Sequence, residues 1–119
     1  MSRILILIAA VTLSLTSSAD ASYLYWTSTS TKAERISTCL RFAKDGFSDL
    51  GYKGIRFTPG VEVSGSKSGV YVAVTCIGTQ PRATAVVMGM GGDGKLVNKL
   101  QAELAQRISL YFCFTGNCD

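Results

Sequence analysis

The stretch that decides the fold is residues 70–77, Val-Tyr-Val-Ala-Val-Thr-Cys-Ile, in which valine or cysteine occupies every second position. Successive side chains of a β-strand point to opposite faces of its sheet, so this pattern predicts a strand with one apolar face. A second valine-rich run, residues 83–88, follows after the loop Gly-Thr-Gln-Pro. These two runs predict the strongest strands of a largely antiparallel sheet.

Outward from these runs, three shorter segments also have strand patterns and are bounded by turn signals. They are residues 23–27, 53–58 and 61–64. Residues 59–60, Pro-Gly, predict the turn between the last two. Residues 65–69, Gly-Ser-Lys-Ser-Gly, predict a flexible hairpin tip.

Two helices are predicted where apolar residues recur at spacings of three and four. The first covers residues 31–50, and Gly51 suits the left-handed position that follows a helix. The second covers residues 93–112, with Asp93 as its N-cap. The order β-α-β-β-β-β-α predicts an α+β fold, with two helices packed on one face of a mostly antiparallel sheet of about four to five strands.

The N-terminal residues have the pattern of a cleaved export signal. Arg3 supplies a positive charge, and residues 4–15 form an apolar run that is shorter than the roughly 20 residues needed to span a bilayer. Residues 19–21, Ala-Asp-Ala, match the small-x-small cleavage pattern. We therefore expect a signal peptide at residues 1–21 and a single α+β domain at residues 22–119. That domain would be periplasmic or secreted, with no membrane span after cleavage.

The four cysteines all lie beyond the expected cleavage site. An even number in a small exported chain favours disulfides, and four cysteines allow three connectivities. A short turn-forming segment separates Cys113 from Cys118, which favours a local bond and leaves Cys39 to pair with Cys76. Because Cys39 lies on an apolar helix stripe and Cys76 on the valine face of a strand, their bond would join helix to sheet. A metal site is the competing interpretation, but Cys-x-x-Cys spacing and histidine are both missing from the sequence.

Residues 89–95, Gly-Met-Gly-Gly-Asp-Gly-Lys, satisfy both the GxGxxG spacing and the GxxxxGK part of a phosphate loop. Backbone N–H groups at the start of a helix can hold an anion. The candidate anion-binding residues are Gly91, Gly92, Gly94 and Lys95. However, Leu96 stands where a phosphate loop needs Ser or Thr, and no later strand can supply the second acidic element. We expect a glycine-rich connection here and keep a weak anion site as the alternative.

Composition limits the remaining chemistry. The formal net charge is +4, and the absence of histidine excludes Ser-His-Asp and Cys-His catalysis. Bases of the first predicted helix alternate with acids and not with aromatic residues, which predicts a solvated face and no nucleic-acid binding. Tyr23, Tyr25 and Trp26 are expected to pack at an edge strand and in the core. No cofactor is indicated.

Residues 70–78, Val-Tyr-Val-Ala-Val-Thr-Cys-Ile-Gly, with the proline-containing loop and valine-rich strand that follow, resemble small exported bacterial proteins of uncharacterised function. The likeness covers about half of the chain, and its motifs are structural. It implies a bacterial periplasmic domain and brings no activity, partner or site residue with it.

Two classes of function follow from these observations. We first expect a non-enzymatic binding or accessory module that binds a partner or a small ligand through an exposed sheet face or the hairpin at residues 65–69. The candidate partner is an envelope or extracellular protein. The alternative is a weak anion-binding or enzymatic domain that uses residues 89–95. A large exposed apolar patch on the sheet favours the first class. A concave pocket walled by the glycine-rich segment favours the second.

Overall fold

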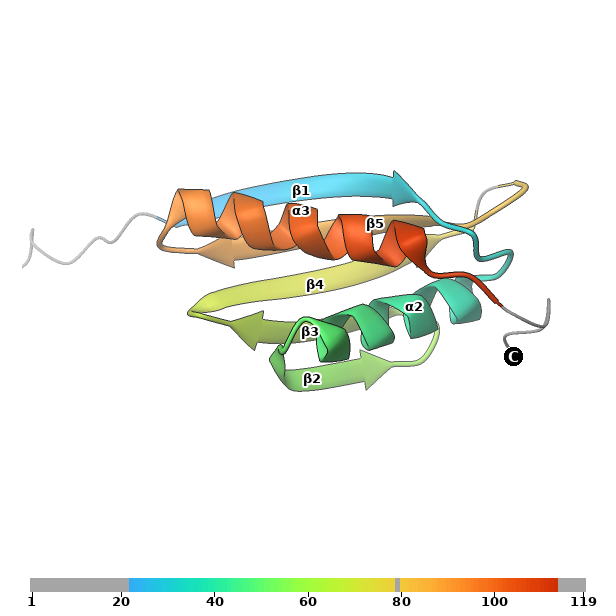
Figure 1. Cartoon of the computed structure of the whole chain (residues 1–119), viewed down its shortest axis with the longest axis horizontal. Helices are drawn as coiled ribbons and strands as arrows, with labels where there is room; N and C mark the ends of the chain where they lie inside the picture. The colour runs from blue at the N-terminus through green and yellow to red at the C-terminus, as the bar shows by residue number, and fades with distance from the viewer. Residues whose placement is uncertain (1–21, 79, 114–119) are drawn as a thin grey trace, which may run out of the picture.

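Five strands and two helices make up the described part of the chain, residues 22–78 and 80–113 (Figure 1). The computed structural model has strands β1 (Tyr23–Ser30), β2 (Lys53–Thr58), β3 (Glu62–Lys67), β4 (Val70–Ile77) and β5 (Thr84–Gly91), and helices α2 (Ile36–Asp49) and α3 (Gly94–Leu110). The strands form one sheet in the order β1-β5-β4-β3-β2, and each neighbouring pair is antiparallel. The predicted α+β fold and its element order are confirmed.

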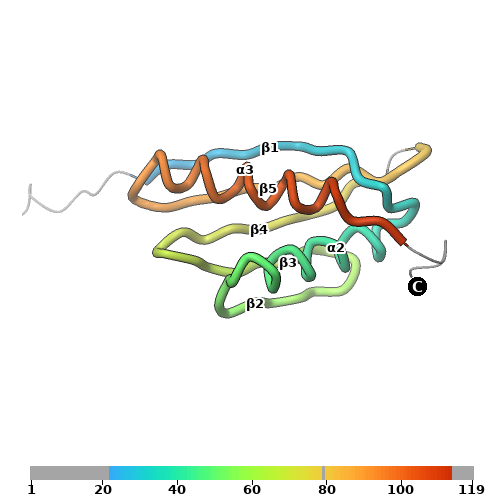
Figure 2. Tube along the Cα trace, viewed as in Figure 1, coloured from blue at the N-terminus to red at the C-terminus, as the bar shows by residue number. Residues whose placement is uncertain are grey.

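Both helices cover the same face of the sheet (Figure 1). Helix α3 packs against β1 and β5, and helix α2 packs against β4 and β3. Strands β1 and β2 run along the two outer margins of the sheet (Figure 2). Within the described ranges, neither helix is long and apolar enough to cross a bilayer.

Strand β4 has the bounds that the valine pattern predicted, and its helix-facing side is buried. Val72 and Val74 are fully buried against the helices. Leu40 of α2 and Leu104 of α3 are also fully buried, so the core lies between the sheet and both helices. Full burial of such a side chain contributes about 1.5–3 kcal/mol, which makes this layer the main source of stability.

A disulfide between Cys39 and Cys76 joins α2 to β4, with the two Cα atoms 6.2 Å apart. This bond confirms the pairing that the sequence predicted, because it crosses from the apolar stripe of the helix to the valine face of the strand. Cys113 is also disulfide-bonded. The predicted pairing of Cys113 with Cys118 lies outside the described residues.

The hairpin between β3 and β4 is tighter than the sequence predicted. Residues 65–67 belong to β3, and Lys67 pairs with Val70, so only Ser68 and Gly69 form the turn. Their φ angles of 53° and 77° suit the two-residue turn that matches strand twist. Gly65 is no turn residue: a Cβ there would lie 3.2 Å from the Phe47 ring, so the glycine makes room for the core.

The first helix begins at Ile36 and not at residue 31 as predicted. The Thr31 hydroxyl donates a hydrogen bond to the Ala83 carbonyl at 2.6 Å, and the Ala83 N–H donates to the Ala33 carbonyl at 2.7 Å. These bonds tie the segment after β1 to the chain that enters β5. Strand β1 accordingly runs on to Ser30, three residues beyond the predicted end at residue 27.

Candidate functional site

The sheet face opposite the helices carries exposed aromatic, leucine and methionine side chains. Strand residues alternate between faces, so a residue beside buried core positions points away from the helices. Tyr71 lies between the buried Val70 and Val72. Met88 precedes Gly89, where a Cβ would meet α3. We call the resulting set the open-face cluster: Leu24 (64% exposed), Trp26 (65%), Tyr71 (47%), Met88 (38%) and Met90 (49%).

Strand pairing places these five residues side by side across β1, β5 and β4. Leu24 is opposite Met90, and Met90 is opposite Tyr71 on its other side. In the next row, Trp26 is opposite Met88. Side chains directly opposite each other in an antiparallel sheet lie about 5 Å apart. The open-face cluster is therefore one continuous apolar surface.

Uncharged residues surround the cluster on the same three strands. The other outward positions are Ser28, Ser30, Ala73, Thr75, Ile77, Thr84 and Val86. Charges on this face of the described sheet lie on the two strands beyond β4: Glu62 of β3, opposite Thr75, and Lys53 and Arg56 of β2, opposite Ser66 and Ser64. Tyrosine, tryptophan and methionine are enriched in the centres of protein interfaces, where charged residues are depleted. The composition of the face is that of an interface centre.

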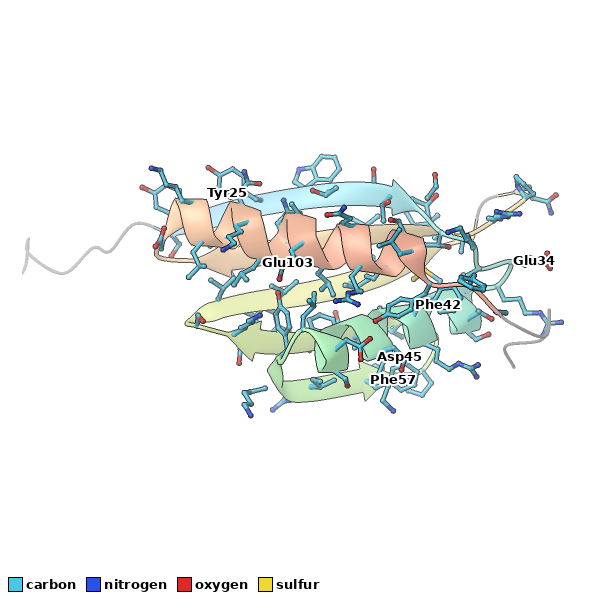
Figure 3. The ribbon with its side chains drawn as sticks, in the orientation of Figure 1. Tyr25, Glu34, Phe42, Asp45, Phe57 and Glu103 are labelled. Atoms are coloured by element: carbon cyan, nitrogen blue, oxygen red, sulfur yellow. A yellow bond between two sulfur atoms is a disulfide. The ribbon has the colours of Figure 1, made fainter. Side chains whose placement is uncertain are left out.

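The prediction that the N-terminal aromatic residues pack at an edge and in the core is correct for the edge strand and wrong for the core, because Tyr23 is 43% exposed, Tyr25 38% and Trp26 65%. Tyr25 is opposite Gly89 on the helix side and lies beside α3 (Figure 3). Trp26, one residue on, faces the open side and is 65% exposed. The sequence did contain a signal for the exposed face. Tyr71 and Met88 occupy the alternate positions to the buried valines of their strands, so they point to the opposite face.

The glycine-rich segment forms a close junction between β5 and α3. Strand β5 continues through Gly91, three residues beyond the predicted end at residue 88, and α3 begins at Gly94. A Cβ on Gly89 would lie 3.2 Å from Gln101 Cβ and 3.3 Å from Val97 Cγ1. Glycine there lets the helix approach the strand closely.

The anion-binding candidates all lie around the start of α3. Gly91 ends β5, Gly94 opens α3, and Gly92 and Lys95 are exposed. The Leu96 N–H donates to Asp93 Oδ1 at 3.2 Å, so a carboxylate already occupies part of the helix N-terminus. This carboxylate would repel an added anion. Anion binding at the junction stays a prediction.

A cleft of about 420 Å³ opens at the other end of β5. Its lining residues are Ser30, Thr31, Glu34, Gln80, Pro81, Arg82 and Thr84. A pair of carboxyl groups can catalyse glycoside hydrolysis. The lining of this cleft has only one carboxylate, that of Glu34, and one guanidinium, that of Arg82. The cleft is not walled by the glycine-rich segment.

Two tyrosines with raised pKa values hold elements of the core together. Burial, the hydrogen bond that Tyr111 donates to Asp49 and the Asp49 charge raise the pKa of Tyr111 well above its usual range. Burial, and then the nearby charge of Glu103, raise the pKa of Tyr52 to about 12. The Tyr52 hydroxyl donates to the Leu100 carbonyl at 3.4 Å. Both side chains are therefore neutral donors near pH 7 and act as structural links.

The comparisons with known proteins give no family. No protein-family model matches the sequence, and no curated protein matches it. Among residues 22–78 and 80–113, no group of histidine, cysteine, aspartate and glutamate side chains is placed to hold a metal ion.

Proposed function

We propose that this protein is a non-enzymatic exported module that binds another protein through the open-face cluster. The observation that carries the proposal is the continuous, uncharged surface made by Leu24, Trp26, Tyr71, Met88 and Met90. Large exposed apolar patches on proteins mark interaction sites. Buried aromatic anchors supply much of the binding energy at such sites.

The support beneath the cluster favours binding without rearrangement. Strands β4 and β5 lie in the middle of the sheet, and their other face is packed against the helices. The Cys39–Cys76 bond fixes β4 to α2 toward the end of the strand that lies away from Tyr71. A side chain on a rigid element loses less conformational entropy on binding than one on a loop.

The composition of the cluster defines the chemistry of the partner. The cluster has no charge to recognise an ionic ligand, and its polar atoms are the Trp26 indole N–H and the Tyr71 hydroxyl. Methionine adapts its shape to different apolar surfaces. The partner is therefore a protein with an exposed apolar patch, and the export signal predicted at residues 1–21, together with the disulfide, supports an envelope or extracellular location for it.

Capture of the partner from an envelope extract tests the proposal. We expect the oxidised protein to retain one partner in stoichiometric amount. The variant Tyr71→Ser/Met88→Ser is expected to lose at least about 90% of it, because two central anchors are removed.

The matched control is Val61→Ser/Leu110→Ser, which removes two exposed apolar side chains outside the cluster. Both variants should unfold at the denaturant concentration of the unmodified protein. Equal capture by the cluster variant and the control would contradict the proposal, as would capture of nothing by the unmodified protein.

A further inference from the structure

Among the described residues no strand pairs with the outer edge of β1, and β1 itself lacks the charges, prolines and bulges that normally protect an edge strand. Its sequence, Tyr-Leu-Tyr-Trp-Thr-Ser-Thr-Ser, contains no charged residue, proline or glycine. Its pairing with β5 is unbroken from Tyr23 to Ser30, so no bulge twists it. An edge strand presents unpaired N–H and C=O groups that can pair with another strand, and proteins block such edges with charges, prolines or bulges.

The opposite edge of the sheet is protected in all of these ways. Strand β2 has a register shift between Lys53 and Arg56, with Gly54 at φ 60° between them. Both flanking residues are basic, and Pro59 follows the strand directly. The contrast singles out β1 as the edge that is open to pairing (Figure 2).

We propose that β1 pairs antiparallel with β1 of a second copy of this chain, so that the two sheets join across a two-fold axis. This inference does not depend on the binding function of the open-face cluster. The sequence of β1 suits self-pairing, because residues 23–26 are bulky and residues 27–30 are small hydroxyl residues. Antiparallel pairing sets the bulky half of one copy against the small half of the other. No like charges meet at the axis.

Helix α3 favours a second copy over an isolated peptide strand. It packs against both β1 and β5, so it lies above the space between them. With strands about 4.8 Å apart, a two-fold axis just beyond β1 places the two α3 helices about 10 Å apart. This is close to the 8–10 Å at which helices pack, so pairing the edges would also bring the helices into contact.

The flank of α3 that overhangs β1 is suited to this contact. Leu104, Arg107 and Ile108 meet Gly46 of α2 on one side of α3. Helical periodicity places Asn98, Ala102 and Ser109 on the other side, with the exposed Lys95 at the start of the same flank. The Lys32 ammonium donates to the Ser109 carbonyl at 3.4 Å, which locates this flank near the end of β1. The side chains of Asn98, Ala102 and Ser109 are short and uncharged, so a second helix can approach α3 along this flank.

Sedimentation tests the proposal by measuring the molar mass of the full, oxidised chain over a wide range of protein concentrations. We expect a dimer. Ser28→Lys places a charge on the edge strand. The two-fold axis brings this lysine near the same lysine of the second copy, and the like charges repel each other. Ala102→Arg leaves β1 intact and blocks the approach of the second helix. Each should raise the dimer Kd by about tenfold or more.

Two variants serve as matched controls. Thr58→Lys adds the same charge to an exposed position on the protected edge, and Tyr71→Ser/Met88→Ser alters the open-face cluster on β4 and β5 and leaves the sequence of β1 unchanged. Both should remain dimeric, with hydrogen exchange of β1 slowed on dimerisation. A monomer at every concentration would overturn the proposal. So would dimers that persist in both Ser28→Lys and Ala102→Arg, or a dimer lost in Tyr71→Ser/Met88→Ser alone.

Discussion

At the scale of single residues, the Cys39–Cys76 bond closes a loop with a sequence separation of 37 and ties the two layers together. A crosslink of this length restricts the unfolded chain, and the chain-entropy model gives about 4 kcal/mol of stabilisation. We predict that Cys39→Ala/Cys76→Ala lowers the free energy of unfolding by at least about 4 kcal/mol. Denaturant unfolding measures the loss, and the fold should be retained because both positions stay apolar.

The position of the bond in the core provides the control for this prediction. Cys39 is fully buried, so part of any loss in the double variant comes from the missing sulfur atoms. The protein reduced by dithiothreitol keeps those atoms and loses the crosslink, together with the disulfide of Cys113. Equal unfolding midpoints for the oxidised and reduced protein would show that the crosslink contributes nothing.

At the scale of elements, the contact between β5 and α3 depends on a missing side chain. A Cβ at residue 89 would approach Val97 Cγ1 and the Val97 carbonyl oxygen to 3.3 and 3.4 Å. We predict that Gly89→Ala lowers the free energy of unfolding by about 1–3 kcal/mol, because the helix must move away from the strand. Gly78→Ala is the control, since its Cβ would come no closer than 3.4 Å to the tip of Ile36. Equal stability of the two variants would show that glycine is not required at residue 89.

Sequence patterns predicted the bounds of some elements and not of others. Strands β2 and β4 have their predicted bounds because alternation and turn residues agree there. Strand β5 runs past its predicted end because Gly89 and Gly91 resemble a loop in sequence, whereas in the fold they admit α3. The start of α2 was misplaced because the hydrogen bonds of Thr31 to the Ala83 segment join parts of the chain that sequence periodicity does not connect.

At the scale of the whole molecule, alternation predicts two faces for each strand but not which face the helices cover. On β4 the choice follows from the valines and Cys76, and the pairing of Cys39 with Cys76 was predicted correctly. On β1 both sets of alternate positions include bulky apolar or aromatic residues, so the exposure of Trp26 depends on its pairing with Met88 of β5. The general expectation of an exposed sheet face was available from the sequence, whereas the members of the cluster required the strand register.

The proposed export of the protein makes a prediction about its N-terminus and its thiols together. If residues 1–21 are removed on export, intact-mass measurement of the protein recovered outside the cytoplasm should give a chain that begins at Ser22. Alkylation under denaturing conditions should then modify none of the four cysteines, because an oxidising compartment completes both bonds. The control is the same chain with residues 2–21 deleted, which should stay in the cytoplasm and react with alkylating reagent after the same treatment. A full-length, reduced chain retained inside the cell would contradict export. It would also remove the reason to look for the partner of the open-face cluster in the envelope, and the apolar surface would then have to be tested against cytoplasmic proteins.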